Sequence, residues 1–312
     1  MRILVTGGAG FIGSNVVDRF VAEGHEVAVF DDLSSGFREF VHSKAKLYVG
    51  DLADAASVDA AIADFRPEVV DHHAAQIDVR KSVTDPVWDA RVNVLGSIGL
   101  LQACVRHGVR KVVYASTGGA LYGEGRQLPA TEDHPVNPEA PYGASKHTVE
   151  HYLYIWKLLH GLDYTVLRYP NVYGPRQNPH GEAGVNAIFI GLMLEQKRPR
   201  IFGDGNAVRD YLYVDDVVEA NVLALAGASG EMLNIGTGVG TSVNDIVREL
   251  GVITGFAEGA IHEPPRAGEV QRIYLDASRA KQVLGWSPKV SFAEGLRRTV
   301  EWSRHHKLPT KH

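Results

Sequence analysis

The chain has 312 residues, of which 45% are hydrophobic and 22% charged, an ordinary balance for a globular protein with a sizeable core. Its 32 basic and 37 acidic residues give a formal charge of −5, which argues against a polycationic surface for nucleic acid. Cys104 is the only cysteine, so we expect a reducing, cytoplasmic compartment. No apolar run has membrane-spanning length, early glycines interrupt any secretory signal, and no histidine or cysteine spacing predicts a metal site.

Short β-branched runs alternate with helix-length segments through the first half of the chain. Strands are predicted at residues 3–6, 26–30, 46–49, 68–71, 111–115 and 164–168, and helices at 11–22, 54–64, 85–107 and 142–160. Strands that are apolar on both faces and joined by helices form parallel sheets covered on both sides. The pattern therefore predicts an α/β fold with a Rossmann-like, doubly wound parallel sheet.

Beyond Tyr173 the rhythm changes, because glycine and proline become frequent. Further helices are predicted at residues 184–196, 215–226, 243–253, 278–284 and 292–305. We find neither internal repeats nor a flexible linker. We therefore expect a sheet domain at residues 1–173, to which parts of 205–240 return, and a smaller C-terminal α/β lobe, mainly 174–312, packed against it.

A glycine-rich turn connects the first predicted strand to the first helix. Gly7, Gly10 and Gly13 remove Cβ atoms from this turn, so that backbone N–H groups and the positive helix end can approach a pyrophosphate. An acid, Asp31, ends the second strand about twenty residues on, where it would accept hydrogen bonds from ribose hydroxyls and repel a 2′-phosphate. This context predicts that the sheet domain binds NAD, not NADP. Asp51-Leu52, after the third strand, either meets the adenine or forms a plain turn.

Tyr142 and Lys146 begin the predicted helix 142–160, and their separation of four puts both side chains on one face. An ammonium group beside a phenol stabilises the phenolate, so we expect Lys146 to lower the pKa of Tyr142. Thr117 follows a predicted strand, where α/β sheets bind ligands, and its hydroxyl can share a proton with the tyrosine. Such a pair alone is typical of a surface; the dinucleotide motif upstream favours a hydrogen-transfer site.

At this point the sequence resembles the extended short-chain dehydrogenase/reductases, the NAD-dependent epimerase/dehydratase family, and most closely their UDP-glucose 4-epimerase branch. The matching segments run through nearly the whole chain: Thr6-Gly7-Gly8-Ala9-Gly10-Phe11-Ile12-Gly13, His73-Ala74-Ala75, Tyr142 with Lys146, Arg168-Tyr169-Pro170-Asn171-Val172-Tyr173-Gly174, Gly203-Asp204-Gly205, Arg209-Asp210-Tyr211, Asn234-Ile235-Gly236, Arg266-Ala267-Gly268-Glu269 and Leu284-Gly285-Trp286. Matches this numerous and ordered are far more specific than any one motif.

The resemblance implies that Tyr142 is the acid/base, that Lys146 also binds the nicotinamide ribose, and that Thr117 replaces the usual catalytic serine. The expected NAD contacts are Gly7, Gly10, Phe11, Ile12, Gly13, Asp31, Asp32, Asp51, Leu52, His73, Ala74, Ala75, Asn93, Tyr142, Lys146 and Tyr169. Many 4-epimerases carry a lysine shortly after the His-Ala-Ala segment, whereas this chain has Gln76-Ile77-Asp78. Although the family holds NAD tightly, we therefore expect weaker retention here.

The resemblance also assigns a UDP-sugar to the C-terminal lobe. It implies that Asn171, Arg209 and Arg266 hold the pyrophosphate, because arginines are charge-assisted donors to phosphate. The expected substrate contacts are Thr117, Gly118, Asn171, Val185 beside the uracil, Arg209, Arg266, Glu269 on the uridine ribose, and Ile273. Ile273 is intermediate in size, which predicts UDP-glucose and UDP-galactose as main substrates with some tolerance of N-acetyl sugars.

The resemblance further implies a homodimer through helices 85–107 and 142–160, although their apolar positions could equally face the protein's own core. Related 4,6-dehydratases need an Asp-Glu pair directly after the threonine, whereas Gly118-Gly119 stand here. Without an acid to drive elimination, a 4-keto sugar can only be reduced again, which is reversible 4-epimerisation. The alternatives are another nucleotide-sugar enzyme (a UDP-N-acetylglucosamine or UDP-glucuronate 4-epimerase, a dehydratase or a reductase) or a catalytically silent NAD-binding protein.

Overall fold

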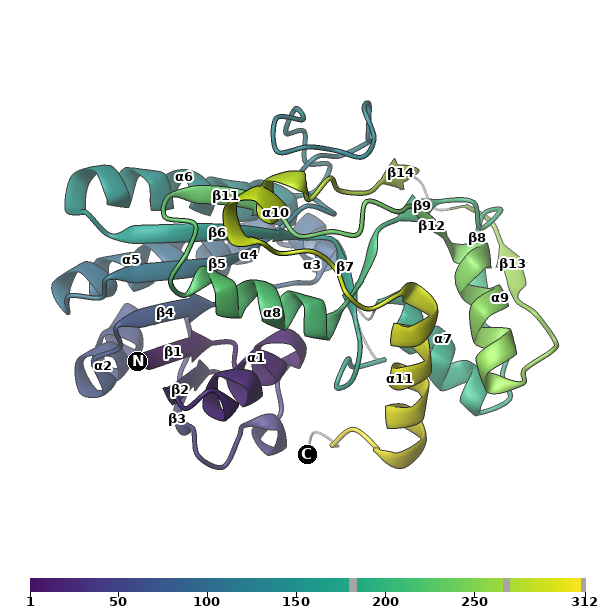
Figure 1. Cartoon of the computed structure of the whole chain (residues 1–312), viewed down its shortest axis with the longest axis horizontal. Helices are drawn as coiled ribbons and strands as arrows, with labels where there is room; N and C mark the ends of the chain where they lie inside the picture. The colour runs from purple at the N-terminus through teal and green to yellow at the C-terminus, as the bar shows by residue number, and fades with distance from the viewer. Residues whose placement is uncertain (180–183, 266–269, 310–312) are drawn as a thin grey trace.

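The computed structural model describes residues 1–179, 184–265 and 270–309. Within these ranges seven parallel strands form the central sheet, in the order β11-β6-β5-β4-β1-β2-β3 (Figure 1). The strands are β1 (Arg2–Thr6), β2 (Glu26–Asp31), β3 (Lys46–Val49), β4 (Val69–His72), β5 (Lys111–Thr117), β6 (Asp163–Tyr169) and β11 (Glu231–Asn234). The predicted doubly wound parallel sheet is confirmed.

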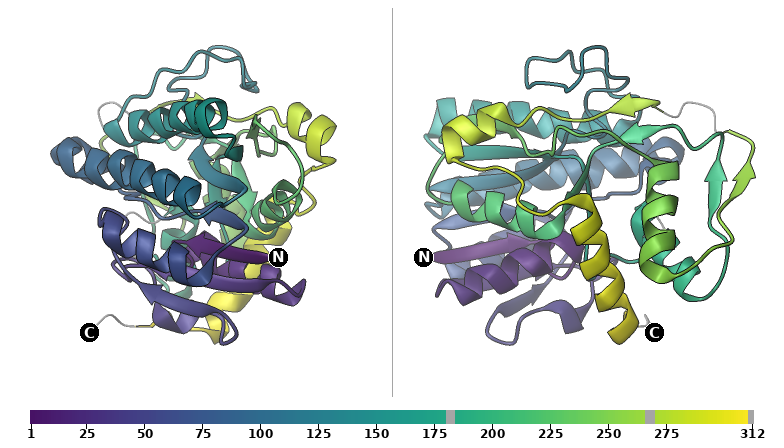
Figure 2. Two further views of the ribbon diagram at one scale, coloured as in Figure 1. Left: turned by 90° about the vertical axis from the view of Figure 1, so that its left-hand side faces the viewer. Right: turned by 45° about the vertical axis from the view of Figure 1, so that its right-hand side comes forward.

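Helices cover both faces of this sheet, as the left view of Figure 2 shows. One face packs against α1 (Phe11–Ala22) and α8 (Val214–Ala224), and the other against α2 (Ala55–Phe65), α5 (Ser97–Arg106) and α6 (Pro141–His160). Side chains alternate along a strand, so Ile3 and Val5 enter the first core while Leu4 enters the second. All three side chains are fully buried, which explains the continuous apolar run.

The predicted helix 85–107 is divided in the structure. It begins as α4 (Pro86–Ala90), passes through a π-helical turn, η2 (Arg91–Gly96), and continues as α5; a separate short helix, α3 (Val79–Thr84), precedes it. Asp85 begins α4, where its carboxylate accepts a hydrogen bond from the Trp88 N–H (3.0 Å). A π turn inside an α-helix is often found at a functional site, and this one carries Asn93.

The C-terminal part forms small sheets and helices beyond the carboxyl ends of the central strands (Figure 1). Its strands are β7 (Asn171–Tyr173) paired with β10 (Tyr211–Tyr213), β8 (Arg200–Phe202) with β13 (Ile261–Glu263), and β9 (Val208–Arg209) with β12 (Thr241–Ser242) and β14 (Arg272–Ile273). Its helices there are α7 (Val185–Leu194), α9 (Val243–Thr254) and α11 (Phe292–His305), whereas α10 (Ser278–Leu284) packs beside β11 and α8. A short 3₁₀ turn, η1 (Arg38–Phe40), follows β2.

The strand order reverses between β1 and β4, because the chain builds outward first through β2 and β3 and then through β4, β5 and β6. Open α/β sheets bind ligands in the crevice outside the carboxyl ends of the strands at such a reversal. This is the edge at which the glycine turn, Thr117 and the segment after β4 all emerge.

Candidate active site

The glycine turn after β1 is packed so closely that larger residues cannot replace its glycines. Gly7 adopts a φ of +70°, and a Cβ on it would lie 2.7 Å from the Ala74 nitrogen. A Cβ on Gly13 would lie 2.3 Å from the Gly7 oxygen. Gly10 is the N-cap of α1 and supplies no side-chain cap, so the first N–H groups of α1, beginning at Phe11, are left for a ligand. The turn therefore fits a pyrophosphate.

Asp31 links this turn to the second strand. It is 7% exposed at the end of β2; one carboxylate oxygen accepts a hydrogen bond from the Ala9 N–H (3.0 Å) and the other from the Leu33 N–H (2.8 Å). An ionised carboxylate has further lone pairs, so Asp31 can also accept a ribose hydroxyl. Asp32 is exposed and its carboxylate accepts from the Ser34 backbone and hydroxyl.

The loop after β4 is fixed by side chains from two neighbouring elements. The Thr6 hydroxyl at the end of β1 accepts the Ala74 N–H (3.1 Å) and bonds with His72 Nδ1 (2.7 Å). The Asn93 amide binds the Gln76 backbone in both directions, accepting its N–H (2.8 Å) and donating to its carbonyl (3.0 Å). The predicted cofactor residues of this loop are therefore held beside the glycine turn.

The other predicted cofactor residues lie in this loop or on the elements around it. The His73 ring stacks on Tyr169 with centroids 6.3 Å apart, and both lie on the α8 side of the sheet, where the Tyr169 hydroxyl donates to Asn221 (3.0 Å). Leu52 is buried against Gly96 of η2. The remaining members of the predicted set follow this placement: Ile12 lies in the first turn of α1, Ala75 follows Ala74 in the loop, and Asp51 is exposed and accepts the Ala53 N–H.

The residues predicted to transfer hydrogen come from β5 and α6. Thr117 ends β5, where its hydroxyl accepts the Ala120 N–H (3.2 Å). Tyr142 and Lys146 lie in the first turns of α6, and the Tyr142 N–H donates to the Ser82 hydroxyl of α3 (3.2 Å). Lys146 is buried, with Nζ lying 4.3 Å from the centre of the Tyr114 ring.

The expected lowering of the tyrosine pKa is not found in the protein by itself. Burial, with a smaller effect from the Asp89 carboxylate, raises the pKa of Tyr142 to about 12. Burial lowers the pKa of Lys146 to about 7, although Glu150 and Asp89 oppose that change. The expectation considered only the attraction of an ammonium for a phenolate and left out desolvation, which here is the largest effect on both groups.

A buried ion pair fixes α6 to the sheet one turn beyond Lys146. The Glu150 carboxylate is fully buried and accepts two hydrogen bonds from Arg168 of β6 (3.0 and 2.7 Å) and one from Ser116 of β5 (2.6 Å). Burial alone would raise the pKa of Glu150, but hydrogen bonds from His147, Arg168 and Ser116 lower it to about 2. Glu150 is therefore charged and compensated.

The two glycines after Thr117 have different surroundings. A Cβ on Gly118 would lie 2.4 Å from Leu275 Cδ1, whereas a Cβ on Gly119 would lie 3.3 Å from Asn171 Oδ1. Leu275 is fully buried, so the space above Gly118 is filled by an apolar side chain. An acidic side chain at position 118 would have to displace it.

The predicted substrate residues are spread over the C-terminal part. Asn171 is exposed in β7, and Val185 begins α7. Arg209 of β9 donates to the backbone carbonyls of Val208 and Gln271. Ile273 is 2% exposed in a small core cluster with Leu121, Tyr122, Ala130 and Leu275. Arg266 and Glu269 lie outside the described residues.

Comparison with known proteins places this geometry in a family. Residues 3–236 match the model of the NAD-dependent epimerase/dehydratase family. The chain belongs to this family. It is 48% identical to the UDP-glucose 4-epimerase of Mycolicibacterium smegmatis, over 98% of this chain and 99% of that protein.

Two solved structures of this family are closely similar. The UDP-glucose 4-epimerase of Thermotoga maritima, solved with UDP-glucose, matches with a TM-score of 0.96 and 49% identity, covering 98% of this chain and 99% of that one. The UDP-glucose 4-epimerase of Thermus thermophilus, solved with NAD, matches with a TM-score of 0.93 and 46% identity, covering 97% and 99%. NAD is thus the cofactor of the family, and the glycine turn and Asp31 of this chain fit it.

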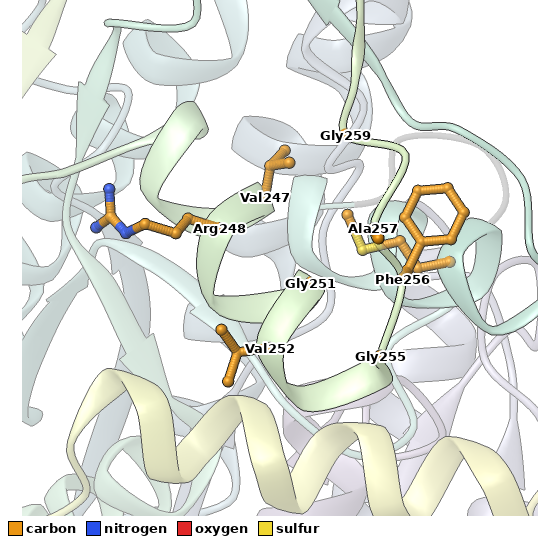
Figure 3. Close-up of a pocket in the computed structure, with 9 residues that line it drawn as sticks. Val247, Arg248, Gly251, Val252, Gly255, Phe256, Ala257 and Gly259 are labelled. Carbon is orange, nitrogen blue, oxygen red and sulfur yellow. The ribbon is translucent and has the colours of Figure 1, made fainter.

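A cavity of about 400 Å³ lies away from the residues predicted to form this family's site. It lies at the C-terminal end of α9, between Met193 of α7, Val247 and Val252 of α9 and the segment 255–259 (Figure 3). Its lining is mostly apolar, with Arg248 as its one charged residue, and includes none of the residues predicted to bind NAD or sugar. Among the described residues no helix is long and apolar enough to cross a membrane, and no group of three or more side chains could hold a metal.

Several residues around the site carry no motif and were missed in the sequence. Asp89, Ser145 and Gln76 form hydrogen bonds between the loop after β4 and the turn of α6 that bears Tyr142 and Lys146, and Leu275 covers Gly118. Asp89 lies four residues before Asn93, a spacing that puts both on one helical face. That spacing, together with an acid in an otherwise apolar segment, was the available signal.

Proposed function

We propose that this protein interconverts UDP-glucose and UDP-galactose by inverting C4 through a transient 4-keto sugar, with NAD as its cofactor. The observation that carries the proposal is that the turn of α6 bearing Tyr142 and Lys146 packs against the loop that follows Thr117, since a Cβ on Gly143 would lie 2.3 Å from the Ala120 oxygen. The chain is also almost half identical to UDP-glucose 4-epimerases. Tyrosine and lysine at this spacing suit proton transfer at a sugar hydroxyl.

The residues that would hold NAD are the turn from Gly7 to Gly13 and Asp31. The uncapped start of α1 offers N–H groups to the pyrophosphate, and the Asp31 carboxylate favours the free 2′-hydroxyl of NAD over a phosphate. When bound, NAD supplies the acceptor and donor of hydride for C4 and, in its oxidised form, a positive charge. That charge favours the phenolate of Tyr142, which burial opposes in the protein alone.

Each of the three polar residues has one task in this proposal. Tyr142 removes the proton from the sugar 4-hydroxyl and later returns it. Lys146, in its ammonium form, stabilises the phenolate and donates hydrogen bonds to the nicotinamide ribose. Thr117, whose hydroxyl both donates and accepts, connects the sugar oxygen with the phenol. The 4-keto sugar presents its opposite face before reduction, so C4 is inverted.

Gly118 and Gly119 support epimerisation over elimination. Neither carries a group that can protonate a leaving hydroxyl, and Leu275 fills the space above Gly118. With no proton donor on this segment, the ketone returns to an alcohol by reduction. A dehydratase activity is therefore not favoured.

The substrate contacts remain part of the proposal. Asn171 and Arg209 would hold the pyrophosphate, with Arg266 as a second cation, while Glu269 would accept the uridine ribose and Val185 would lie beside the uracil. Arg209 supports this because its guanidinium already borders β14 and, of its five N–H donors, keeps some beyond its three backbone partners, the carbonyls of Val208, Gln271 and Val270. Ile273 sets glucose and galactose as main substrates, with some N-acetyl tolerance.

We further propose a homodimer formed through α4, η2, α5 and α6. Large apolar side chains are exposed along these helices: Val87, Leu95, Tyr154, Ile155, Leu158 and Leu159. Exposed apolar patches of this kind are typical of subunit interfaces. Sedimentation of wild type and of Leu159→Glu tests this, because a dimer should weaken in the variant. The unpaired, buried Cys104 supports a reducing, cytoplasmic location.

A panel of UDP-sugars tests the proposed function. With NAD present, UDP-galactose should yield UDP-glucose, faster than UDP-N-acetylglucosamine yields its epimer. Faster turnover of the N-acetyl sugar or of UDP-glucuronate would assign a different epimerase, and a 4-keto-6-deoxy product would assign a dehydratase. Absence of any product, with NAD bound, would indicate a silent protein.

A further inference from the structure

A buried carboxylate lies between the cofactor loop and the catalytic helix. Asp89 of α4 is fully buried. One of its oxygens accepts hydrogen bonds from Gln76 Nε2 (3.0 Å) and Asn93 Nδ2 (3.1 Å), and the other accepts the Ser145 hydroxyl (2.6 Å). Gln76 belongs to the loop after β4, and Ser145 precedes Lys146 in α6. One side chain thus joins both halves of the site.

Asp89 differs from the other buried acid near the lysine in having only neutral partners. Glu150 is paired with Arg168 and His147, whereas within the described ranges no cationic nitrogen lies within 4.0 Å of the Asp89 carboxylate. Burying a carboxylate without an opposite charge is costly. A buried carboxylate of this kind is best explained by a nearby cation whose charged form it stabilises. Lys146 is a buried cation whose charge Asp89 favours.

The groups that face Lys146 come from four elements. They are Asp89 of α4, Glu150 of α6, Tyr114 of β5 and His72 of β4, and Tyr142 lies on the same helical face as Lys146, four residues before it. Burial lowers the pKa of His72 well below its usual value, so His72 is neutral, and burial raises the pKa of Tyr114, which is also neutral. Glu150 is already compensated by Arg168. Asp89 therefore remains as the uncompensated negative charge.

We propose that Asp89 is a positioning residue that fixes the catalytic turn of α6 to the loop after β4 and supplies the counter-charge of the Tyr142–Lys146 pair. It acts through Ser145 and Gln76 and through its charge. This inference rests on the proposed function, because it concerns the protonation of the pair that transfers the sugar proton.

The sign of the effect follows from the charge alone. In the reactive state, Tyr142 and Lys146 together have lost one of their two titratable protons, and the other proton is on either group. A nearby negative charge opposes that loss, so the step occurs at lower pH once the charge is removed. Asp89→Asn should therefore move the acid limb of kcat/KM down by about one pH unit. The variant preserves shape, because the Ser145 hydroxyl can accept from the new amide.

The experiment compares Asp89→Asn with two matched variants. Ser145→Ala removes one hydrogen bond but keeps the charge, and Asp85→Asn removes an exposed carboxylate from the same region. The pH profiles of kcat/KM for UDP-galactose should shift for Asp89→Asn alone. NADH binding without sugar can be followed by NADH fluorescence. In the same variant this binding should weaken at a pH about one unit lower than in wild type, because Lys146 loses its proton at lower pH.

The outcomes separate this inference from the proposed function. A wild type that converts no UDP-galactose would defeat the function, while the NADH titration would still report on Asp89. A folded Asp89→Asn variant could keep the wild-type pH midpoints of both kcat/KM and NADH binding and show only a lower Tm or kcat. That result would show a purely structural role and overturn the proposal. If Asp89→Asn does not fold, Gln76→Leu replaces it: cutting the link to the loop should weaken NADH binding several-fold, and unchanged binding would overturn the proposal.

Discussion

Leu275 occupies the space that any side chain on Gly118 would need, since a Cβ built on Gly118 lies 2.4 Å from Leu275 Cδ1. Real Cβ atoms are not found this close to another carbon, so either the fully buried Leu275 side chain must take another position or the loop after β5 must shift. Because Thr117 directly precedes Gly118, such a shift also moves a residue of the proposed site.

Gly118→Ala should therefore lower both stability and turnover, by about 1–3 kcal/mol in the free energy of unfolding, the range typical of overpacked cores. Gly119→Ala is the matched control, since its Cβ would approach Asn171 Oδ1 at 3.3 Å and would otherwise meet neighbours only at 4.0 Å. Adding Leu275→Ala to Gly118→Ala should cost less than the two single changes together. Thermal unfolding of the four variants measures this, and additive losses would show that the two positions do not interact.

Replacing the tyrosine tests its proposed role as the proton acceptor. Tyr142→Phe should lower kcat by about 10²–10⁴-fold, the usual contribution of a general base, while the dissociation constants of NADH and UDP change little. Tyr154→Phe, at an exposed position of the same helix, should leave kcat as in the wild type. Stopped assays with UDP-galactose give kcat, and a Tyr142→Phe enzyme with normal turnover would remove the phenol from the mechanism.

Retention of NAD tests the effect of Gln76-Ile77-Asp78, which stand where many 4-epimerases carry a lysine. Gln76 is turned inward to Asp89, and Ile77 is 55% exposed, so neither supplies a cation to the cofactor phosphates. Extensive dialysis should lower activity, and added NAD should restore it. Ile77→Lys should retain more NAD through the same dialysis, measured as absorbance released on denaturation; full activity of dialysed wild type without NAD would contradict the expectation.

The buried Glu150–Arg168 pair predicts that the free energy of unfolding falls at low pH. The pKa of Glu150 is about 2 in the folded protein, against an ordinary value of 4.5. A depressed pKa contributes stability that is present above about pH 4.5 and is lost as the pH falls toward 2. Glu150→Gln should lose about 3–5 kcal/mol at pH 7, because a buried guanidinium is left unpaired.

The acid-dependent part of this stability is isolated by comparison of Tm values. Between pH 5 and pH 2, wild type should lose more Tm than Glu150→Gln, so the two curves converge. Glu150→Gln combined with Arg168→Met removes both charges and should be more stable than Glu150→Gln alone. Parallel curves for wild type and Glu150→Gln would mean that this carboxylate does not titrate with folding.

Much of the fold could be predicted because its signals are local. The strand around Val5 is apolar on both faces, and the glycines after it have one structural explanation, a close turn into a helix. The division of helix 85–107 could not be predicted, since the π turn around Asn93 exists to bring that amide against the Gln76 backbone, a contact across 17 residues. No pattern of apolar and polar residues in the sequence indicates a contact of this kind.

The site, too, contains residues that have a local signal in the sequence and residues that have none. Tyr142 and Lys146 share a helical face, so their spacing alone predicts their proximity. The expected lowering of the Tyr142 pKa was wrong, because burial depends on how α3, α4 and β5 close around the pair. Asp89 and Leu275 reach the site from distant segments, and a single acid or leucine in a sequence does not indicate which turn it will contact.

The fate of the hydrogen on C4 tests the central claim most directly. UDP-galactose carrying deuterium at C4 should give UDP-glucose that retains the deuterium at C4, in ordinary water, because hydride leaves and returns within one bound complex. Mass spectrometry and proton NMR of the product measure this retention. Loss of the label to solvent, or conversion with the C4 configuration unchanged, would contradict 4-epimerisation through a tethered 4-keto sugar.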